Sequence, residues 1–118
     1  MINHEKLDCY QRSLTMIKEL QKEMPTFPLG SSHLKDQLRR ALISISLNIA
    51  EGASKPYPKD KRRFYAIARG SAGEVSACID VCLCLNLLSQ ARSQSLKFQL
   101  FILTKQLSAL MKATETIP

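Results

Sequence analysis

The sequence contains no tryptophan, and only four of its 118 residues are glycine and five are proline. Long spans contain neither glycine nor proline, the two residues that most strongly disfavour helices. Strands are rich in aromatic residues such as tryptophan, which is missing here. These scarcities argue against a sheet-based fold and predict a mostly α-helical protein.

Long apolar runs are also missing from the sequence. The most apolar window, residues 75–88, is interrupted by Asp80 and Asn86 and is shorter than the ~20 residues that cross a bilayer. The first ten residues do not show a basic segment followed by an apolar one, as a secretory signal would. We therefore expect a cytoplasmic protein that does not bind membranes. In that compartment the four cysteines stay reduced and form no disulfide framework.

Acidic residues are scarce relative to basic ones. The chain has 17 lysines and arginines against 10 aspartates and glutamates, a formal net charge of +7. Hydrophobic residues make up 45% and charged residues 23%, as in globular proteins, and the length suits one domain, residues 1–118. The excess of positive charge favours polyanionic partners such as nucleic acid or anionic lipid.

Apolar residues recur every three or four positions in four segments, the spacing of amphipathic helices. The predicted helices cover residues 5–23, residues 33 or 34 to 53, residues 58 or 60 to 88, and a last segment that follows a polar turn at 89–93 and ends near 114. Ser31 or Ser32 is expected to cap the second helix, and a serine of the polar turn is expected to cap the fourth. Pro56 and Pro58 make the strongest break in the sequence. Four helices with short links predict an all-α, antiparallel up-down-up-down four-helix bundle.

The second predicted helix has apolar residues on more than one face. Its main stripe includes Leu38, Leu42 and Ile45, and Ile43 and Leu47 widen the stripe in the later turns. A helix that is apolar on more than one face buries more than one face. We therefore expect the protein to associate with copies of itself.

The most informative charged feature is a basic cluster between residues 55 and 69. It contains six cations and one acid, Asp60, which leaves a net charge of +5; the cations are Lys55, Lys59, Lys61, Arg62, Arg63 and Arg69. Tyr57 and Tyr65 lie among them and are candidates to stack on unpaired bases, while the cations would neutralise phosphates. Arg39 and Arg40 are candidates to extend the patch. The alternative is a solvated helix start that binds no ligand.

The position of this cluster bears on the choice between a ligand-binding role and a solvated helix start. Cations are unfavourable at the N-terminus of a helix, where the helix dipole prefers acids. A function other than helix stability is therefore expected to account for Lys59, Lys61, Arg62 and Arg63 at the start of the third helix.

Motifs typical of other functions are weak in this sequence. Residues 70–73 match the GxxG loop of KH domains, but without strands we interpret their small residues as helix packing. Cys78 and Cys82 lie one turn apart, and we interpret them as buried thiols rather than metal ligands. Neither histidine has a glutamate three residues before it, as a di-iron bundle requires. Glu51 and Glu74 are interpreted as a salt bridge between helices or as caps. We therefore predict no metal, no cofactor, no catalytic residue and no enzymatic activity.

Two segments carry a resemblance to a known family. Residues 44–52 (SISLNIAEG) and 67–74 (IARGSAGE), on either side of the basic link, resemble the signature of the bacterial four-helix-bundle family of 23S ribosomal RNA intervening-sequence proteins. That family includes the accessory variability determinant proteins of diversity-generating retroelements. The matching positions are Asn48, Glu51, Gly52, Ala68, Gly70, Ser71 and Glu74. Gly73 departs from the pattern, where a larger apolar residue is expected.

The resemblance implies a ring-like homopentamer with a basic surface that contacts nucleic acid, and it implies no enzymatic activity. For the ribosomal branch it implies a reading frame within a sequence inserted in a 23S ribosomal RNA gene; for the retroelement branch it implies a reverse transcriptase as partner. We therefore expect a non-catalytic, oligomeric protein that binds RNA or DNA. The alternative is an adaptor whose oligomer binds a protein, such as a reverse transcriptase or a ribosomal component.

Overall fold

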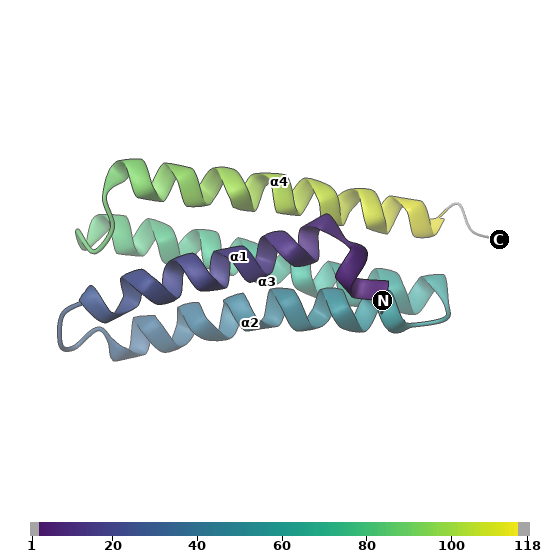
Figure 1. Ribbon diagram of the computed structural model, residues 1–118, viewed down its shortest axis with the longest axis horizontal. Coiled ribbons are helices and arrows are strands. Elements are labelled where there is room, and N and C mark those ends of the chain that lie inside the picture. Colours follow the sequence, from purple (N-terminus) through teal and green to yellow (C-terminus); the bar gives the residue numbers. More distant parts are fainter. Residues whose placement is uncertain (1–2, 116–118) are drawn as a thin grey trace.

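The computed structural model describes residues 3–115, and this part of the chain forms four long helices and no strand (Figure 1). The helices are α1 (Asp8–Glu23), α2 (Ser32–Ser54), α3 (Pro58–Cys84) and α4 (Gln90–Glu115), and two short 3₁₀ turns, η1 (Asn3–Lys6) and η2 (Met24–Thr26), flank α1. The prediction of an all-α four-helix bundle is confirmed.

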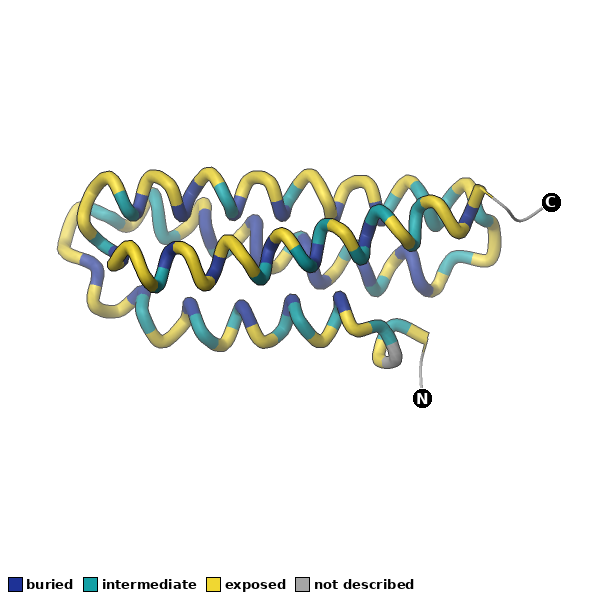
Figure 2. Tube along the Cα trace, turned by 90° about the horizontal axis from the view of Figure 1, so that it is seen from above, coloured by how far each residue is buried: buried dark blue, intermediate teal, exposed yellow. Residues whose placement is uncertain are grey.

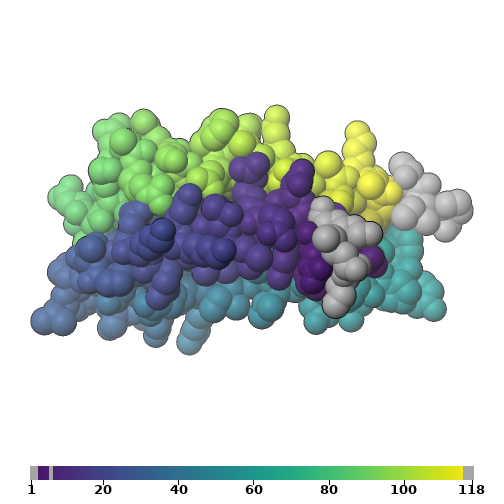
Figure 3. All heavy atoms as spheres, in the orientation of Figure 1, coloured from purple at the N-terminus to yellow at the C-terminus, as the bar shows by residue number. Residues whose placement is uncertain are grey.

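The bundle is an elongated rod of 51 × 22 × 20 Å. In Figure 1 consecutive helices run in opposite directions, so the α1–α2 and α3–α4 links lie at one end of the rod. The α2–α3 link, η1 and the last turn of α4 lie at the other end. Figure 3 shows α1 covering the face between α2 and α4.

The start of the first helix and the end of the third differ from the predicted boundaries. The first helix starts at Asp8 rather than at residue 5, because extended backbone at Leu7 (φ −84°, ψ 126°) separates it from η1. The third helix ends at Cys84 rather than at residue 88. There Asn86 has φ 59°, a left-handed conformation that asparagine tolerates better than most residues. Apolar residues continue to Leu88, which is buried, so the hydrophobic pattern gave no sign of this turn.

The two predicted serine caps had different outcomes. Ser89 caps α4, because its Oγ accepts a hydrogen bond of 3.0 Å from the backbone N–H of Arg92. Residues 90–93 therefore belong to the first turn of α4 rather than to a separate turn. Ser31 precedes α2, but its hydroxyl donates to the carbonyl of Pro28 and does not cap the helix, so that prediction was wrong.

The core runs the length of the rod. Figure 2 shows buried positions recurring along the side of each helix that faces its neighbours, the arrangement that the apolar spacing predicted. The largest fully buried side chains are Met16, Leu20, Met24, Leu38, Ile45, Ile49, Ile79, Leu96, Leu103 and Leu107.

Three of the four cysteines belong to this core. Cys9, Cys78 and Cys82 are buried free thiols, as interpreted from the sequence, whereas Cys84 is exposed. Burial raises the pKa of Cys9 and of Cys82 to about 11. Both thiols therefore stay protonated at neutral pH and act as small apolar side chains.

Helices α2 and α3 are in close contact near their link. A Cβ atom added at Gly52 would lie 2.7 Å from Cε1 of Tyr65 and 3.1 Å from the carbonyl oxygen of Lys61. The small side chain of Ala68 is fully buried on the same helix as Tyr65. Gly52 therefore allows the contact that closes the hairpin.

Gly70 and Gly73 do not share this role. A Cβ atom at either position would meet no other atom within 4 Å. The interpretation of these two glycines as packing residues was therefore wrong within the described chain, and both lie on the exposed side of α3.

The close contact predicts opposite effects for two glycine substitutions. Gly52→Ala is expected to lower the free energy of unfolding by about 1–2 kcal/mol, because the new methyl group forces Tyr65 out of the core. Gly70→Ala, the matched control, is expected to leave that free energy unchanged or raise it by up to ~1 kcal/mol, because alanine is the better helix former. Urea denaturation followed by circular dichroism measures both. A Gly52→Ala protein as stable as the unmodified chain would contradict the packing described.

Candidate nucleic-acid interface

The basic cluster begins in the α2–α3 link, a short segment with a defined backbone. Pro56 and Pro58 fix their own φ angles and disfavour helical backbone in the residues before them. Lys55 (φ −77°, ψ 138°) and Tyr57 (φ −104°, ψ 134°) are accordingly extended. Since α3 starts at Pro58, the cations that follow lie in its first turns, at one end of the rod.

Lys61 serves the fold rather than a ligand. Its Nζ donates hydrogen bonds to the carbonyls of Ala53 (2.9 Å) and Gly52 (3.3 Å) in the last turn of α2. The carbonyl of Gly52 also accepts a hydrogen bond of 3.3 Å from the backbone N–H of Lys55. A positive charge at a helix C-terminus is favourable. Lys61 lies in the first turn of α3 and caps the C-terminus of α2. The second role accounts for a cation at the start of a helix, where cations are otherwise unfavourable.

Arg62 connects two helices that are far apart in the sequence. Its Nε donates a hydrogen bond of 2.9 Å to Oγ1 of Thr114, a buried residue in the last turn of α4. Thr114 in turn donates to the carbonyl of Met111. Arg62 therefore fixes the end of α4 against the start of α3.

Lys55 and Arg63 lie close to one aromatic ring. Nζ of Lys55 lies 5.1 Å from the centroid of the Phe64 ring, and the guanidinium carbon of Arg63 lies 4.6 Å from it. Such contacts with a ring face orient the cations without neutralising them. Lys55 also forms an ion pair of 3.3 Å with Glu51, so Glu51 does not bridge two helices as the sequence suggested.

The remaining cations of the cluster are exposed. Lys59, Arg63 and Arg69 form no ion pair and no side-chain hydrogen bond within residues 3–115. Lys59, Arg62 and Arg63 line a hollow of about 420 Å³ together with Asp60, Ala66 and Met111. We call this feature the basic hollow. It combines three cations with one carboxylate, a composition suited to an anion.

The sequence did not identify the contribution of α4 to the basic hollow. Met111 lines it, and the exposed Lys112 follows directly. No local sequence signal relates these residues to α3. Only the antiparallel packing of the two helices, fixed in part by Arg62 and Thr114, brings them there.

The two tyrosines of the cluster have different surroundings. Tyr57 is 68% exposed, whereas Tyr65 is 4% exposed and packs against Gly52. Burial also raises the pKa of the Tyr65 hydroxyl. Tyr65 is therefore a core residue, and its proposed role in base stacking was wrong; Tyr57 remains available.

Arg39 and Arg40 lie away from the cations at the start of α3. The Oγ atoms of Ser44 and Ser71 are 2.7 Å apart, so these residues lie at the same level of the rod. Arg40 is four residues from that level and Arg63 is eight residues from it in the opposite direction. At 1.5 Å per residue the two arginines are separated by about 18 Å along the axis. Arg40 and Arg63 therefore do not form one patch within a single subunit, whereas Arg69, two residues from the same level, is about 9 Å from Arg40 along the axis.

The other positions of the family resemblance lie along the same hairpin. Nδ2 of Asn48 donates to the carbonyl (2.8 Å) and to Oγ (3.1 Å) of Ser44, which places a polar contact between α2 and α3 beside Ser71. The side chain of Glu74 is exposed and forms neither an ion pair nor a hydrogen bond with any described residue, so the predicted salt bridge or cap was wrong for this residue.

Further expectations concern metals, loops and membranes. Within residues 3–115 no group of three or more His, Cys, Asp or Glu residues is placed to hold a metal ion. Residues 70–73 lie inside α3 and form no loop of the KH type. None of the described helices combines the length and apolar character that a membrane span requires.

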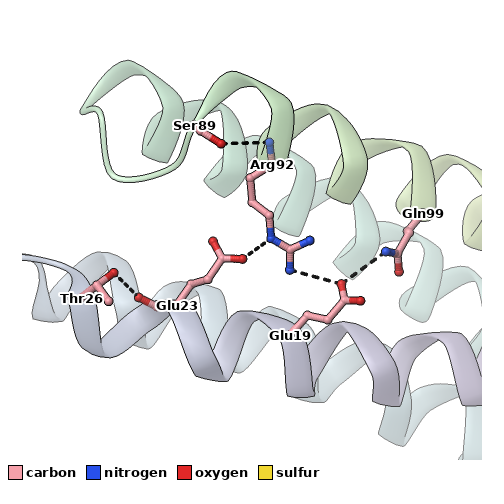
Figure 4. A network of polar contacts seen from close by, with 6 residues as sticks. All are labelled: Glu19, Glu23, Thr26, Ser89, Arg92 and Gln99. Atoms are coloured by element: carbon pink, nitrogen blue, oxygen red, sulfur yellow. Dashed lines mark hydrogen bonds and ion pairs between the residues drawn. The ribbon is translucent and has the colours of Figure 1, made fainter.

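Charge is distributed differently at the opposite end of the rod. There Arg92 of α4 bridges Glu23 and Glu19 of α1, with 3.3 Å between Nη2 of Arg92 and Oε2 of Glu19, and Gln99 joins the network (Figure 4). The hydrogen bond to Glu23 raises the pKa of Arg92. Arg92 is thus neutralised by acids of a neighbouring helix, unlike Lys59.

The contacts divide the cluster into structural cations, Lys61 and Arg62, and free cations, which include Lys59 and Arg63. This division predicts that substitutions in the two groups differ in their effect on stability. The double substitution Lys61→Ala, Arg62→Ala is expected to lower the free energy of unfolding by about 1–2 kcal/mol, because it removes the cap on α2 and the bond to Thr114. Lys59→Ala, Arg63→Ala removes the same charge and is expected to change that free energy by less than about 0.5 kcal/mol. Urea unfolding of both variants measures the difference. Equal losses of stability would contradict the division.

Comparison with known proteins identifies a family. Residues 5–109 match the family model described as 23S rRNA-intervening sequence protein. The match includes α1, α2 and α3 completely and all but the last six residues of α4. No curated protein matches the chain. The matched segment contains the α2–α3 link and every cation of the cluster between residues 55 and 69.

Proposed function

The chain belongs to the family of 23S rRNA-intervening sequence proteins, and we propose that it is a non-catalytic protein that binds nucleic acid as an oligomer. The observation that carries this proposal is the pair of exposed cations Lys59 and Arg63 on the basic hollow. Neither has an acidic partner among the described residues, in a chain whose net charge is +7. Arg63 contacts the ring of Phe64, but neither charge is neutralised within the fold, which supports a role in binding an anionic ligand.

Phosphate groups are the anions that suit this arrangement. Lysine and arginine neutralise phosphates and release the counterions condensed on the nucleic acid, so binding weakens steeply as salt increases. Lys59, Arg63 and Lys112 supply charge from two helices, and Arg62 lines the hollow between them. The description of the family refers to 23S rRNA, which makes structured RNA the first ligand to test and a DNA duplex the second.

Self-association would multiply a weak site. Ile43 and Leu47 lie one turn apart on the outer face of α2, and they are 48% and 60% exposed. They form no part of the core of their own subunit, so we assign them to a contact between copies in a ring-like homopentamer. A site repeated around a ring gains avidity from phosphate contacts that are individually weak.

A different surface favours the second candidate, a protein-interaction adaptor. At the end of the rod opposite the basic hollow, a hollow of about 470 Å³ is lined mainly by Pro28, Leu29, Leu34, Leu85 and Leu87. An apolar hollow of this kind suits a protein partner such as a reverse transcriptase or a ribosomal component. Binding there would be insensitive to salt, which distinguishes it from binding to nucleic acid.

Removing the free cations is expected to weaken binding and its salt dependence together. Fluorescence anisotropy of a labelled structured RNA and of a matched DNA duplex, at low and moderate salt, measures both quantities. For Lys59→Ala, Arg63→Ala the slope of log affinity against log salt is expected to become shallower by about one unit for each phosphate that the variant no longer neutralises.

The matched control for this experiment is Lys18→Ala, Lys22→Ala. These two lysines of α1 lie toward the other end of the rod, and their removal changes the net charge equally. The control is expected to bind as the unmodified chain does. Equal losses of affinity in both variants would show that only net charge matters, and absence of binding at low salt would contradict the proposed function.

The proposed subunit contact predicts a change in assembly. Ile43→Gln, Leu47→Gln is expected to reduce the molar mass measured by light scattering from that of an oligomer to that of a monomer. The helix content is expected to stay unchanged, because both residues are exposed and glutamine is a good helix former. Leu29→Gln, at an exposed position of the α1–α2 link, is the control and is expected to leave the mass unchanged. A monomer at micromolar concentration for the unmodified chain would contradict the ring.

A further inference from the structure

Tyr57 is an aromatic residue that the fold does not use. It is 68% exposed, and in the described part of the chain its ring has no aromatic or cationic partner and its hydroxyl no hydrogen bond. Phe101, by comparison, is exposed but has Lys105 over its ring at 4.9 Å. A single exposed aromatic residue is common on protein surfaces, so exposure alone does not indicate a binding role for Tyr57. Its position on the α2–α3 link, next to the free cations, does indicate one.

Tyr57 stands on a rigid support. It is the residue between two prolines, its backbone is extended (φ −104°, ψ 134°), and its carbonyl accepts a hydrogen bond of 3.0 Å from the N–H of Lys61. Lys61 itself is anchored to α2 by its side chain. Because this backbone is already fixed, little conformational entropy is lost when a ligand contacts the ring.

The free cations lie next to this ring along the chain. Lys59 is two residues after Tyr57, so their Cα atoms are at most ~7 Å apart, and Arg63 follows one helical turn after Lys59 on the same side of α3. Lys59 and Arg63 both line the basic hollow. One aromatic surface and two phosphate-binding cations are therefore presented within a few residues of each other.

From this juxtaposition we propose that Tyr57 stacks on an unpaired base while Lys59 and Arg63 hold the adjacent phosphates, so that the site prefers single-stranded nucleic acid to a duplex. The proposal rests on the proposed function and specifies its ligand. In a duplex the base faces are covered by neighbouring base pairs, and only the backbone is available to the cations. In a single strand each base offers a face to an aromatic side chain.

The absence of tryptophan from the chain makes the stacking contact directly observable. Tyr57→Trp introduces a single fluorophore at the site. Its emission is expected to be quenched when a twelve-nucleotide single strand of RNA or DNA binds and to stay unchanged when a duplex of the same sequence binds. Phe98→Trp, at an exposed position in α4, is the control, and its emission is expected to stay unchanged with all of these ligands. Quenching by either the RNA or the DNA single strand supports stacking. Comparison of the two identifies the sugar that the site accepts.

The second measurement compares the affinities of Tyr57 variants for a single strand and for a duplex. Tyr57→Ala is expected to weaken binding of the single strand by about 5- to 100-fold and binding of the duplex by less than about twofold. Tyr57→Phe keeps the ring and is expected to bind the single strand as the unmodified chain does. An equal decrease of affinity for single strand and duplex would overturn the proposal, because it would indicate a disturbed link rather than the removal of a stacking ring.

The failure of this inference is distinguishable from that of the proposed function. If Tyr57→Ala binds single strands unchanged while Lys59→Ala, Arg63→Ala is weakened, nucleic-acid binding stands and stacking is wrong. If the unmodified chain binds neither single strand nor duplex at low salt, both proposals are wrong.

Discussion

The contact between Gly52 and Tyr65 is the constraint on which the rest of the hairpin depends. Because residue 52 has no side chain, the ring of Tyr65 packs against the backbone of α2, and α3 starts within reach of the end of α2. That proximity lets Lys61 cap the carbonyls of Gly52 and Ala53. It also leaves only a short link with two prolines, which extends the backbone at Tyr57 and exposes its ring. The structural role of Lys61 and the exposure of Tyr57 both follow from this close approach.

The pairing of cations with acids differs between the two ends of the rod. At the α1–α2 end Arg92 is paired with two glutamates, and farther along Lys97 is paired with Asp80. At the α2–α3 end Lys59 and Arg63 have no acidic partner among the described residues. Acids thus join helices toward the α1–α2 end, whereas Lys59 and Arg63 stay unpaired at the α2–α3 end although Glu51 and Asp60 also lie there. The proposed oligomer would bring several such ends together and raise the local density of positive charge.

The sequence predicted the helices, the proline break and the basic cluster, because each depends on residues close in the chain. It did not predict which cations are free, because that depends on contacts across the fold: Arg62 is bound by Thr114, 52 residues later. The same holds for the tyrosines: Tyr65 of α3 is buried against Gly52 of α2, whereas Tyr57 lies in the link and is exposed. The end of α3 was also missed, since apolar residues continue through the turn at Asn86. The local pattern therefore located the candidate site without resolving the role of each residue in it.

Amide hydrogen exchange with and without a structured RNA tests the central claim most directly, because it locates the bound surface without any substitution. The account predicts slower exchange in the α2–α3 link, in the first turns of α3 and in the last turn of α4, and reversal of that protection at higher salt. The α1–α2 and α3–α4 links are expected to exchange at unchanged rates. Protection at those links, with none near Lys59 and Arg63, would contradict the placement of the nucleic-acid site at the basic end.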